Sequence, residues 1–396
     1  AGQGVAARGA AVRLVHGVMV LGRPLDRSFA AVTASLIPQD RALARALAMQ
    51  VLRRLPALDA LIDSATARPL AADARARHAL RVALAGWLVL GTPPHAAIAT
   101  ILPLVEGGPR RLVHGVLSTL MRRGATLSPP TLPAPFATRW AKEWGAAAAA
   151  AAARQFGAIP PTDLRLKDAA QTAGWVDRLG GRSLFPGHVR LDGSQAVAAL
   201  SGYDSGDWWV QDVAAQLPAV LLGDVRGARV LDLCAAPGGK TMQLAAAGAE
   251  VTSVDVSAAR MERLSENLSR TGLVATSVVA DALEWEPVAP FDAILLDAPC
   301  TATGTFRRHP DVLHLKGALD PAPLIALQRR LAARAAGWLK PGGRLVVAVC
   351  SLDRAEGEDQ PTVPGVTADL VRAEELAPGL LPDAGGGVRT LPTLWE

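Results

Sequence analysis

Val-Leu-Asp-Leu-Cys-Ala-Ala-Pro-Gly-Gly-Lys-Thr, residues 230–241, decides the fold of this 396-residue chain. It joins a short apolar run to a glycine-rich turn and then to a segment suited to a helix, a pattern that recurs up to residue 349. Because apolar strands that alternate with helices are buried on both faces, the sequence predicts a mostly parallel, Rossmann-like α/β sheet. The predicted strands are 229–233, 250–255, 276–280, 291–297 and 344–349, and the predicted helices are 239–247, 258–271 and 321–338.

The turn at 234–240 indicates the kind of ligand. A dinucleotide-binding turn needs Gly-x-Gly-x-x-Gly, which this turn lacks. A phosphate-binding loop needs a glycine where the chain has Cys234, and Pro237 has no amide to offer a phosphate. Asp255, at the end of the second strand, is placed to accept hydrogen bonds from ribose hydroxyls. Together these features predict an adenosyl cofactor without phosphates, and S-adenosylmethionine is the commonest of that kind.

The three cysteines of the chain, Cys234, Cys300 and Cys350, each follow an apolar, strand-like run. An open α/β sheet binds its ligands outside the carboxyl ends of its strands, so this shared position predicts one common site. Their spacing offers no Cys-x-x-Cys pair for zinc and their number is odd, which favours free thiols in a reducing compartment. No signal peptide is recognisable, and no apolar run reaches about 18 residues. We therefore expect a cytoplasmic protein with no membrane contact and no metal.

The positive charge is concentrated in the first third of the chain. Residues 1–140 carry 17 arginines, no lysine and 6 acidic residues, a net charge of +11, whereas the remaining 24 basic and 30 acidic residues give −6. A basic unit joined to a mildly acidic one favours a nucleic-acid partner, because phosphate contacts supply most sequence-independent affinity. The alternative is a set of solvated helix faces with no such partner.

Apolar residues in this first third recur at helical spacing. The pattern predicts a helical bundle over about residues 5–127, whose last helix ends near Gly124. The three apolar stripes are Leu43, Leu47, Val51 and Leu55; Leu80, Leu84, Trp87 and Leu88; and Val113, Val116, Leu117 and Leu120.

Prolines and alanines then set the predicted boundaries. Four prolines in residues 128–135 predict an extended linker, and eight consecutive alanines predict a helix over 140–156. We therefore expect a helical unit at 1–127, a proline-rich linker at 128–139, a connecting α+β subdomain at 140–222 and the sheet domain at 223–396.

Four segments resemble motifs of the RNA 5-methylcytosine methyltransferases of the Nol1/Nop2/Sun family. The helical first third resembles the NusB-like RNA-binding domain, and the combination is similar to enzymes that act on 16S ribosomal RNA of the small subunit. The resemblance implies S-adenosylmethionine-dependent methylation of carbon 5 of a cytosine. The four segments are 230–241, Asp-Ala-Pro-Cys-Thr-Ala-Thr-Gly-Thr-Phe-Arg-Arg-His-Pro-Asp (297–311), Lys-Pro-Gly-Gly (340–343) and Cys-Ser-Leu (350–352).

The resemblance also implies roles for individual residues. Cys350 matches the nucleophile, Cys300 matches the cysteine associated with release of the methylated RNA, and Asp297 matches the acid that holds the cytosine ring. The RNA contacts implied beside Cys300 are Arg307, Arg308 and His309. The implied cofactor-binding residues are Cys234, Ala235, Ala236, Pro237, Gly238, Gly239, Lys240, Asp255, Arg260, Asp281 and Asp297.

The chemistry explains why two cysteines are needed. Carbon 5 of cytosine is a weak nucleophile, so a thiolate must first add to carbon 6. A second group must then remove the proton from carbon 5 before the thiolate can leave. We therefore expect the sulfurs of Cys300 and Cys350 to converge, in an electropositive setting that Lys240 and the arginines at 307 and 308 would supply.

Two alternatives stay open at this point. Cys300 could be the nucleophile, as in DNA cytosine methyltransferases, or the chain could be a non-catalytic RNA-binding or assembly factor that keeps the cofactor fold. Val349 stands where the family usually has threonine before its nucleophile. We expect packing roles for Cys234 and for Trp208 and Trp209, a structural role for the acidic pair Glu356 and Glu358, and a monomeric protein.

Overall fold

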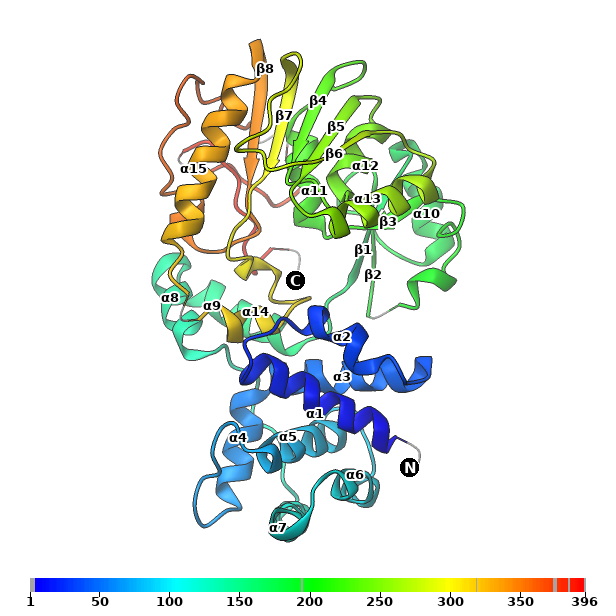
Figure 1. Ribbon diagram of the computed structural model, residues 1–396, viewed down its shortest axis with the longest axis vertical. Coiled ribbons are helices and arrows are strands. Elements are labelled where there is room, and N and C mark those ends of the chain that lie inside the picture. The colour runs from blue at the N-terminus through cyan, green and yellow to red at the C-terminus, as the bar shows by residue number, and fades with distance from the viewer. Residues whose placement is uncertain (1–3, 194, 318, 373–375, 384, 395–396) are drawn as a thin grey trace. The chain divides into compact units, whose positions relative to one another are not determined.

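The computed structural model describes residues 4–193, 195–317, 319–372, 376–383 and 385–394 (Figure 1). The chain forms two compact units. The helical unit comprises Ala1–Ala158 and Thr305–Leu319, and the sheet unit comprises Ile159–Gly304 and Asp320–Glu396.

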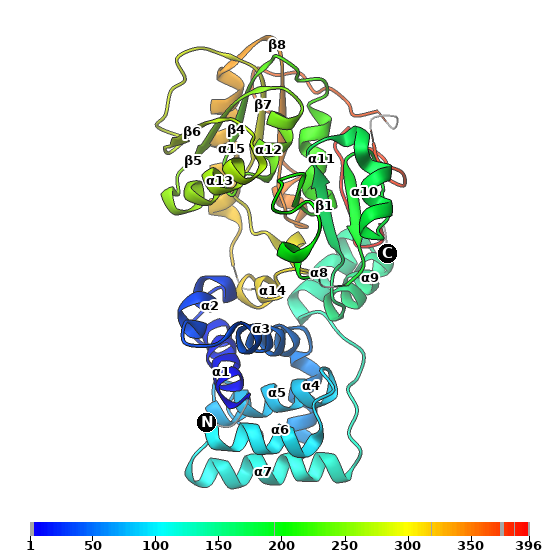
Figure 2. The ribbon, with the colours of Figure 1, turned by 90° about the vertical axis from the view of Figure 1, so that its right-hand side faces the viewer.

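The helical unit is built around the three predicted apolar stripes. The buried members of these stripes belong to one hydrophobic cluster, in which α5 packs against α1, α3, α6 and α7. Figure 2 shows α5, α6 and α7 lying side by side. Gly124, with φ 60, ends the last helix of the bundle as predicted. The helices are α1 (Val5–Met19), α2 (Leu25–Thr33), α3 (Pro38–Arg53), α4 (Leu55–Ser64), α5 (Arg75–Leu88), α6 (Pro94–Ile101), the 3₁₀ turn η1 (Leu102–Leu104), α7 (Gly107–Arg122), α8 (Ala134–Trp144), α9 (Ala146–Gly157) and α14 (Asp311–Leu315).

The proline-rich and alanine-rich stretches differ from the prediction. Helix α8 begins at Ala134, inside the predicted linker at 128–139, with Pro135 in its first turn, where a missing N–H costs no helical hydrogen bond. The single helix predicted over 140–156 is instead two helices, because Gly145 adopts φ 87 and separates α8 from α9. Helix α9 is nevertheless anchored by the fully buried Phe156.

A segment from much later in the chain completes the helical unit. Residues Thr305–Leu319 belong to it, so the predicted sheet domain at 223–396 is interrupted. Phe306 is buried, with its ring centroid 5.4 Å from that of Trp140 and 6.4 Å from that of Phe156. The Asp311 carboxylate accepts a 2.9 Å hydrogen bond from the Leu25 amide at the start of α2. The segment is therefore part of the packed core of this unit.

Five strands form the larger sheet of the sheet unit and are parallel, as the sequence predicts; their order is β6-β5-β4-β7-β8. Strand β8 begins five residues earlier than predicted and takes in the Lys-Pro-Gly-Gly segment, with an irregular register opposite β7. The chain order reverses between β4 and β7, and ligands of open α/β sheets bind at such a switch point. The elements are β4 (Arg229–Leu233), α12 (Gly239–Ala246), β5 (Glu250–Asp255), α13 (Ala258–Thr271), β6 (Thr276–Val279), β7 (Phe291–Asp297), α15 (Ala322–Gly337) and β8 (Leu339–Ala348), with the 3₁₀ turns η4 (Thr303–Thr305) and η5 (Arg354–Glu356).

Alternate residues of the central strands are buried on opposite faces of this sheet. Leu231 and Leu233 of β4 belong to the cluster that includes α15, whereas Val230 belongs to the cluster that includes α12 and α11 (Val213–Leu221). Figure 1 shows α15 on one side of the sheet and α11, α12 and α13 on the other. Burial on both faces explains why the strands read as continuous apolar runs.

A small antiparallel sheet in the order β2-β1-β3 precedes the large one. Its centre is Asp163, a fully buried carboxylate that accepts from Arg190 Nε at 2.6 Å and from the Val213 amide at 3.2 Å. These bonds join the small sheet to α11. The elements are β1 (Thr162–Leu166), η2 (Ala169–Gln171), α10 (Thr172–Leu179), β2 (His188–Leu191), η3 (Val197–Ala199) and β3 (Trp208–Val210).

None of the helices within the described ranges is both long enough and apolar enough to cross a bilayer.

Candidate active site

The turn between β4 and α12 contains the predicted cofactor-binding stretch, Cys234–Lys240. Cys234 and Gly238 have φ values of 59 and 102. A Cβ atom on Gly238 would lie 2.9 Å from Leu264 Cγ, so only glycine fits here without movement of α13. The Gly238 amide donates to the Ala235 carbonyl at 2.9 Å. The Ala236 amide donates to Asp255 at 3.1 Å. These two amides therefore donate to groups of the protein itself, whereas a phosphate-binding loop would present its amides to the ligand.

Two carboxylates follow the neighbouring strands β5 and β6. Asp255 accepts from the Ser257 amide at 2.9 Å through Oδ1, and Arg260 Nη1 lies 3.4 Å from its Oδ2. Asp281 is exposed and accepts from the Leu283 amide at 2.9 Å. An adenosyl group presents ribose hydroxyls and an exocyclic amine, all hydrogen-bond donors. A set of carboxylate acceptors beside a turn unsuited to phosphates fits S-adenosylmethionine.

An ion pair crosses the switch point of the sheet. Lys240 Nζ, at the start of α12, lies 2.7 Å from Asp297 Oδ2, at the end of β7. The side chains are 13% and 33% exposed, so the pair is partly shielded from water. Burial alone would lower the pKa of Lys240, but Asp297 outweighs it and the pKa is raised. Lys240 therefore stays charged beside the strand ends.

Asp232 of β4, which interacts electrostatically with Lys240, Asp297 and Asp255, was not among the predicted residues. Its side chain is fully buried, and burial raises the pKa of this carboxyl to about 7, although the Thr241 hydroxyl donates to it at 2.6 Å. Oδ1 of Asp232 has no hydrogen-bond partner among the described residues. A signal was present in the sequence, because an aspartate inside an otherwise apolar strand must be buried there.

The sulfurs of Cys300 and Cys350 converge, as predicted. Their Sγ atoms lie 3.4 Å apart, and the Cys350 side chain is exposed. The hydrogen bond between them lowers the pKa of Cys350 and raises that of Cys300. Burial also raises the pKa of both thiols and Asp297 raises that of Cys350, whereas Lys240 lowers the pKa of Cys350. The pair can therefore hold one thiolate, stabilised on Cys350.

A buried polar network joins the turns that carry the two cysteines. The Thr301 hydroxyl lies 3.0 Å from that of Ser351 and donates to Glu356. The Thr301 amide also donates to Glu356, at 3.0 Å, and Gln328 of α15 donates to the same oxygen at 3.0 Å. All four side chains are almost fully buried. Glu356 thus has the structural role predicted for it.

The main chain after Cys350 is fixed by the Cys300 turn. The Gly304 amide donates to the Cys350 carbonyl at 2.9 Å, and the Leu352 amide donates to the Thr303 hydroxyl at 2.9 Å. A Cβ atom on Gly304 would lie 2.9 Å from the Cys350 oxygen, so a glycine is needed for this close approach. The sequence did not reveal these contacts, because their partners lie about 50 residues apart.

The other predicted residues lie elsewhere. Cys234 packs against the apolar cluster on the α15 face, and burial raises the pKa of its thiol to about 12. Trp208 and Trp209 are buried, as predicted, and Trp209 packs against Ala235 and Ala236 of the cofactor turn.

The residues predicted to contact RNA, Arg307, Arg308 and His309, belong to the helical unit, whereas Cys300 belongs to the sheet unit. The Arg307 carbonyl accepts from Arg53 within that unit, and His309 Nδ1 lies 3.3 Å from Asp26. Among the residues that the structure describes, no group of three or more histidines, cysteines and acids is arranged to hold a metal ion.

Comparison with known proteins identifies families for two parts of the chain. Residues 219–363 match the family described as 16S rRNA methyltransferase RsmB/F, and residues 5–122 match the NusB family. A solved structure of the protein PH0851 shares the fold, with a TM-score of 0.67 and 22% identity over 89% of this chain and 88% of the other.

Curated relatives match along nearly the whole length. The ribosomal RNA small subunit methyltransferase B of Xylella fastidiosa is 37% identical over 90% of this chain and 88% of its own. The protein of the same name from Cronobacter sakazakii is 35% identical over 89% and 88%. On this similarity, and with the fold and cofactor turn described above, the chain belongs to the S-adenosylmethionine-dependent 16S rRNA methyltransferase RsmB/F family.

Proposed function

We propose that this chain methylates carbon 5 of a cytosine in ribosomal RNA, and that Cys350 forms a transient covalent bond to carbon 6. The observation that carries the proposal is the pair of thiols 3.4 Å apart beside the Lys240–Asp297 ion pair, at the switch point of the sheet. Members of the family act on 16S rRNA, which supports ribosomal RNA as the substrate.

The proposed reaction begins with addition of Cys350. The thiolate pair forms the bond from sulfur to carbon 6, and the former double-bond electrons make carbon 5 nucleophilic while the ring takes up a proton at N3. S-Adenosylmethionine would supply the methyl group, with cleavage of the bond to its positively charged sulfur and return of that electron pair to the sulfur, so that S-adenosylhomocysteine leaves. Loss of the proton from carbon 5 then re-forms the double bond as the bond from sulfur to carbon 6 breaks, the electron pair returns to Cys350, and N3 releases the proton that it took up. The net change is one C–H bond replaced by a C–CH₃ bond, with release of one proton.

The electrostatics of the pair support Cys350 rather than Cys300 as the nucleophile. The hydrogen bond lowers the pKa of Cys350 and raises that of Cys300, and only the thiolate is an effective nucleophile. Cys350 is also the exposed member of the pair.

The same hydrogen bond supports a later role for Cys300. Once Cys350 is bonded to carbon, it no longer carries a negative charge, and this cause of the raised pKa of Cys300 disappears. Cys300 then becomes easier to deprotonate at the stage when release begins. We assign it to that release.

Asp297 is the group proposed to hold the protonated cytosine ring. Its carboxylate ends β7 and accepts a hydrogen bond from Lys240 through Oδ2, which fixes its orientation. A carboxylate can accept from the N3 and N4 positions of the ring while its partner lysine keeps it in place. We further propose that the residues at 234–240, Asp255, Arg260 and Asp281 bind the cofactor.

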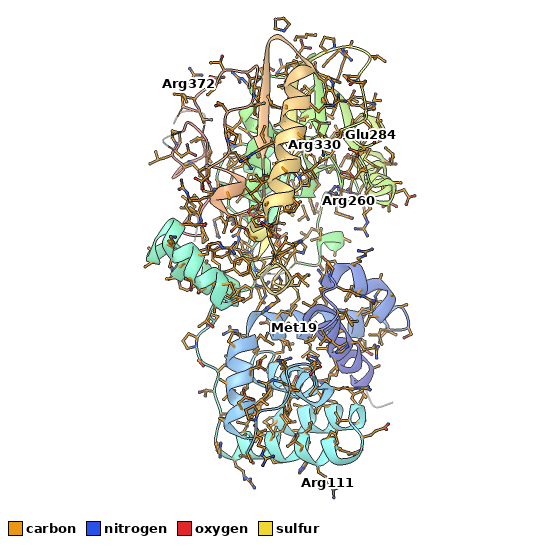
Figure 3. All side chains as sticks on the ribbon, turned by 60° about the vertical axis from the view of Figure 1, so that its left-hand side comes forward. Met19, Arg111, Arg260, Glu284, Arg330 and Arg372 are labelled. Carbon is orange, nitrogen blue, oxygen red and sulfur yellow. The ribbon has the colours of Figure 1, made fainter. Side chains whose placement is uncertain are left out.

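We assign RNA docking to the helical unit and to Arg307, Arg308 and His309 within it. The arginines of this unit suit the phosphates of an RNA backbone. Arg111, for example, projects outward from α7 (Figure 3). The proposal includes a monomer that works on its RNA in the cytoplasm.

Single-cysteine variants test the assignment. Unmodified 16S rRNA is incubated with labelled S-adenosylmethionine, and products are separated on a denaturing gel. Cys350→Ala is expected to lose both methylation and the covalent adduct, whereas Cys300→Ala is expected to accumulate an RNA–protein adduct. Ser269→Ala, at an exposed serine of α13, is the control and keeps activity. The reverse pattern for Cys300 and Cys350 would make Cys300 the nucleophile.

A binding measurement separates the enzyme from a non-catalytic scaffold. Calorimetry with S-adenosylmethionine is expected to show binding to the wild type and much weaker binding to Asp255→Ala. No heat from the wild type would favour the scaffold. Bisulfite sequencing of ribosomal RNA from a deletion strain then identifies the methylated cytosine.

A further inference from the structure

Arg389 reaches from the C-terminal part of the chain to the turn that carries Cys350. The guanidinium donates through Nε and Nη2 to the two carboxylate oxygens of Glu358, each at 2.7 Å. The two side chains are only 14% and 13% exposed. A two-point pair of this kind holds both groups in one plane and resists screening by solvent.

The third nitrogen of Arg389 bonds the main chain beside the proposed nucleophile. Nη1 donates to the carbonyl of Ser351, the residue after Cys350. The amide of the same peptide group, that of Leu352, donates to Thr303. This peptide plane is therefore held from both sides, by Arg389 on its oxygen and by Thr303 on its nitrogen.

The Gly304 amide also donates to the Cys350 carbonyl. The main chain from Cys350 to Leu352 is therefore held by hydrogen bonds at three successive points. Two of these points come from the Cys300 turn. Arg389 supplies the third point. Without Arg389, the Ser351 carbonyl would lose a hydrogen-bond donor.

Gly357 leaves space for the side chain of Arg389. A Cβ atom on Gly357 would lie 2.2 Å from Arg389 Nη2, so any larger residue would displace the guanidinium. The loop from η5 to Glu358 is therefore shaped around the arginine side chain.

The C-terminal segment has other attachments that do not depend on Arg389. Ala377 and Leu380 are buried against Leu217 of α11, and Val388 packs on the same cluster. These apolar contacts attach the segment without Arg389. The contribution specific to Arg389 is therefore the orientation of the Cys350 turn.

We infer that Arg389 is a positioning residue, which fixes the Cys350 turn through Ser351 and Glu358. The inference rests on the proposed function, in which Cys350 attacks carbon 6. Since displacement of a reacting group by about 1 Å can cost about a hundredfold in rate, loosening this turn is expected to slow the chemical step and to leave substrate binding intact.

Kinetics of Arg389→Met test the inference. We expect kcat to fall about 10- to 100-fold, while KM for RNA and the affinity for S-adenosylmethionine change little; the melting temperature falls, because Glu358 loses its shielded partner. Arg389→Lys keeps the charge and one hydrogen bond, so it is expected to recover part of kcat. The matched control is Arg330→Met, which removes an exposed arginine on α15 (Figure 3) and is expected to behave like the wild type.

Two results would overturn the inference. One is a kcat for Arg389→Met within twofold of the wild type. The other is a fall in cofactor affinity that parallels the fall in kcat, which marks a merely structural role. If Arg389→Met does not fold, the same criteria apply to Arg389→Lys. Cys350→Ala is measured in the same experiment, to distinguish the proposed function from the positioning role. If Cys350→Ala methylates RNA, the proposed function is refuted. If Cys350→Ala is inactive and Arg389→Met is fully active, only the positioning role of Arg389 is refuted.

Discussion

The cofactor turn, Cys234–Lys240, and the cysteine turns, 298–304 and 350–358, lie at the same edge of the sheet but are built by different means. The cofactor turn is shaped by its backbone, with positive φ at Cys234 and Gly238 and with amides bonded to Ala235 and Asp255. The cysteine turns are held together by side chains, through a buried network centred on Thr301 and Glu356.

This difference indicates how each region responds to substitution. A turn shaped by its backbone tolerates changes of side chain but not a change that alters φ or close approach. A turn held by side chains depends on single hydroxyl and carboxyl groups, each of which leaves buried partners unsatisfied when removed. The two thiols proposed to act on the cytosine therefore lie in the region that is more sensitive to substitution.

The largest effect is expected from Thr301→Val, which keeps the shape of the side chain and removes its hydroxyl. Ser351, Asp353 and Glu356 each lose a buried partner, so the substitution is expected to destabilise the sheet unit by about 3 kcal/mol. Methylation is expected to fall with it. Thermal unfolding and methyl transfer measure both effects.

The exposed Thr276 of β6 provides the matched control, and Thr276→Val is expected to change neither quantity. Wild-type stability for Thr301→Val would show that the network does not hold the cysteine turns together.

A smaller effect is expected at the cofactor turn from Gly238→Ala. The added Cβ meets Leu264 and forces a side chain to adopt φ 102, at a cost of about 1–2 kcal/mol. Calorimetry should show roughly tenfold weaker binding of S-adenosylmethionine, whereas alkylation of Cys350 by iodoacetamide should keep its wild-type rate. Gly337→Ala, at a helical glycine with open space around it, is the control. Slower alkylation in Gly238→Ala would mean that the two regions are not independent.

The last expected effect, from Asp232→Asn, concerns the dependence of stability on pH rather than activity. Burial raises the pKa of Asp232 in the folded protein to about 7, well above its ordinary value of 3.8. The folded state therefore binds the proton more tightly, and stability is lost as pH rises from about 4 to about 7, by at most about 1.4 kcal/mol per pH unit. Asparagine removes this slope.

Melting temperatures at pH 5 and pH 7.5 test this expectation. The difference between the two should be smaller for Asp232→Asn than for the wild type, and unchanged for Asp204→Asn, at an exposed aspartate. A steeper slope in Asp232→Asn would contradict the raised pKa.

The sequence predicted the sheet well, because its strands and helix α13 each have a clear local pattern of apolar residues. Strands β4, β5 and β7 and helix α13 were located to the residue, since burial on both faces and the apolar stripe of α13 leave clear signals. The convergence of Cys300 and Cys350 was also predictable, because both follow neighbouring parallel strands.

What the sequence did not reveal depends on contacts between distant residues. Nothing near Arg389 in the sequence points to Ser351 or Glu358, and a lone phenylalanine such as Phe306 has no periodicity that would assign it to a helical core. Gly145 was hidden for another reason: its neighbours are strong helix formers, and only its conformation in the folded chain shows the break between α8 and α9.

The membership of Thr305–Leu319 in the helical unit has a consequence for synthesis on the ribosome. Phe306, Asp311 and His314 contact residues made more than 150 positions earlier, so the first unit cannot complete its core until the cofactor turn and the Cys300 turn have emerged. A nascent chain that stalls before residue 305 would present an incomplete aromatic cluster around Trp140 and Phe156. The helical unit can therefore complete its core only after residues 159–304 of the sheet unit and then residues 305–319 have been synthesised.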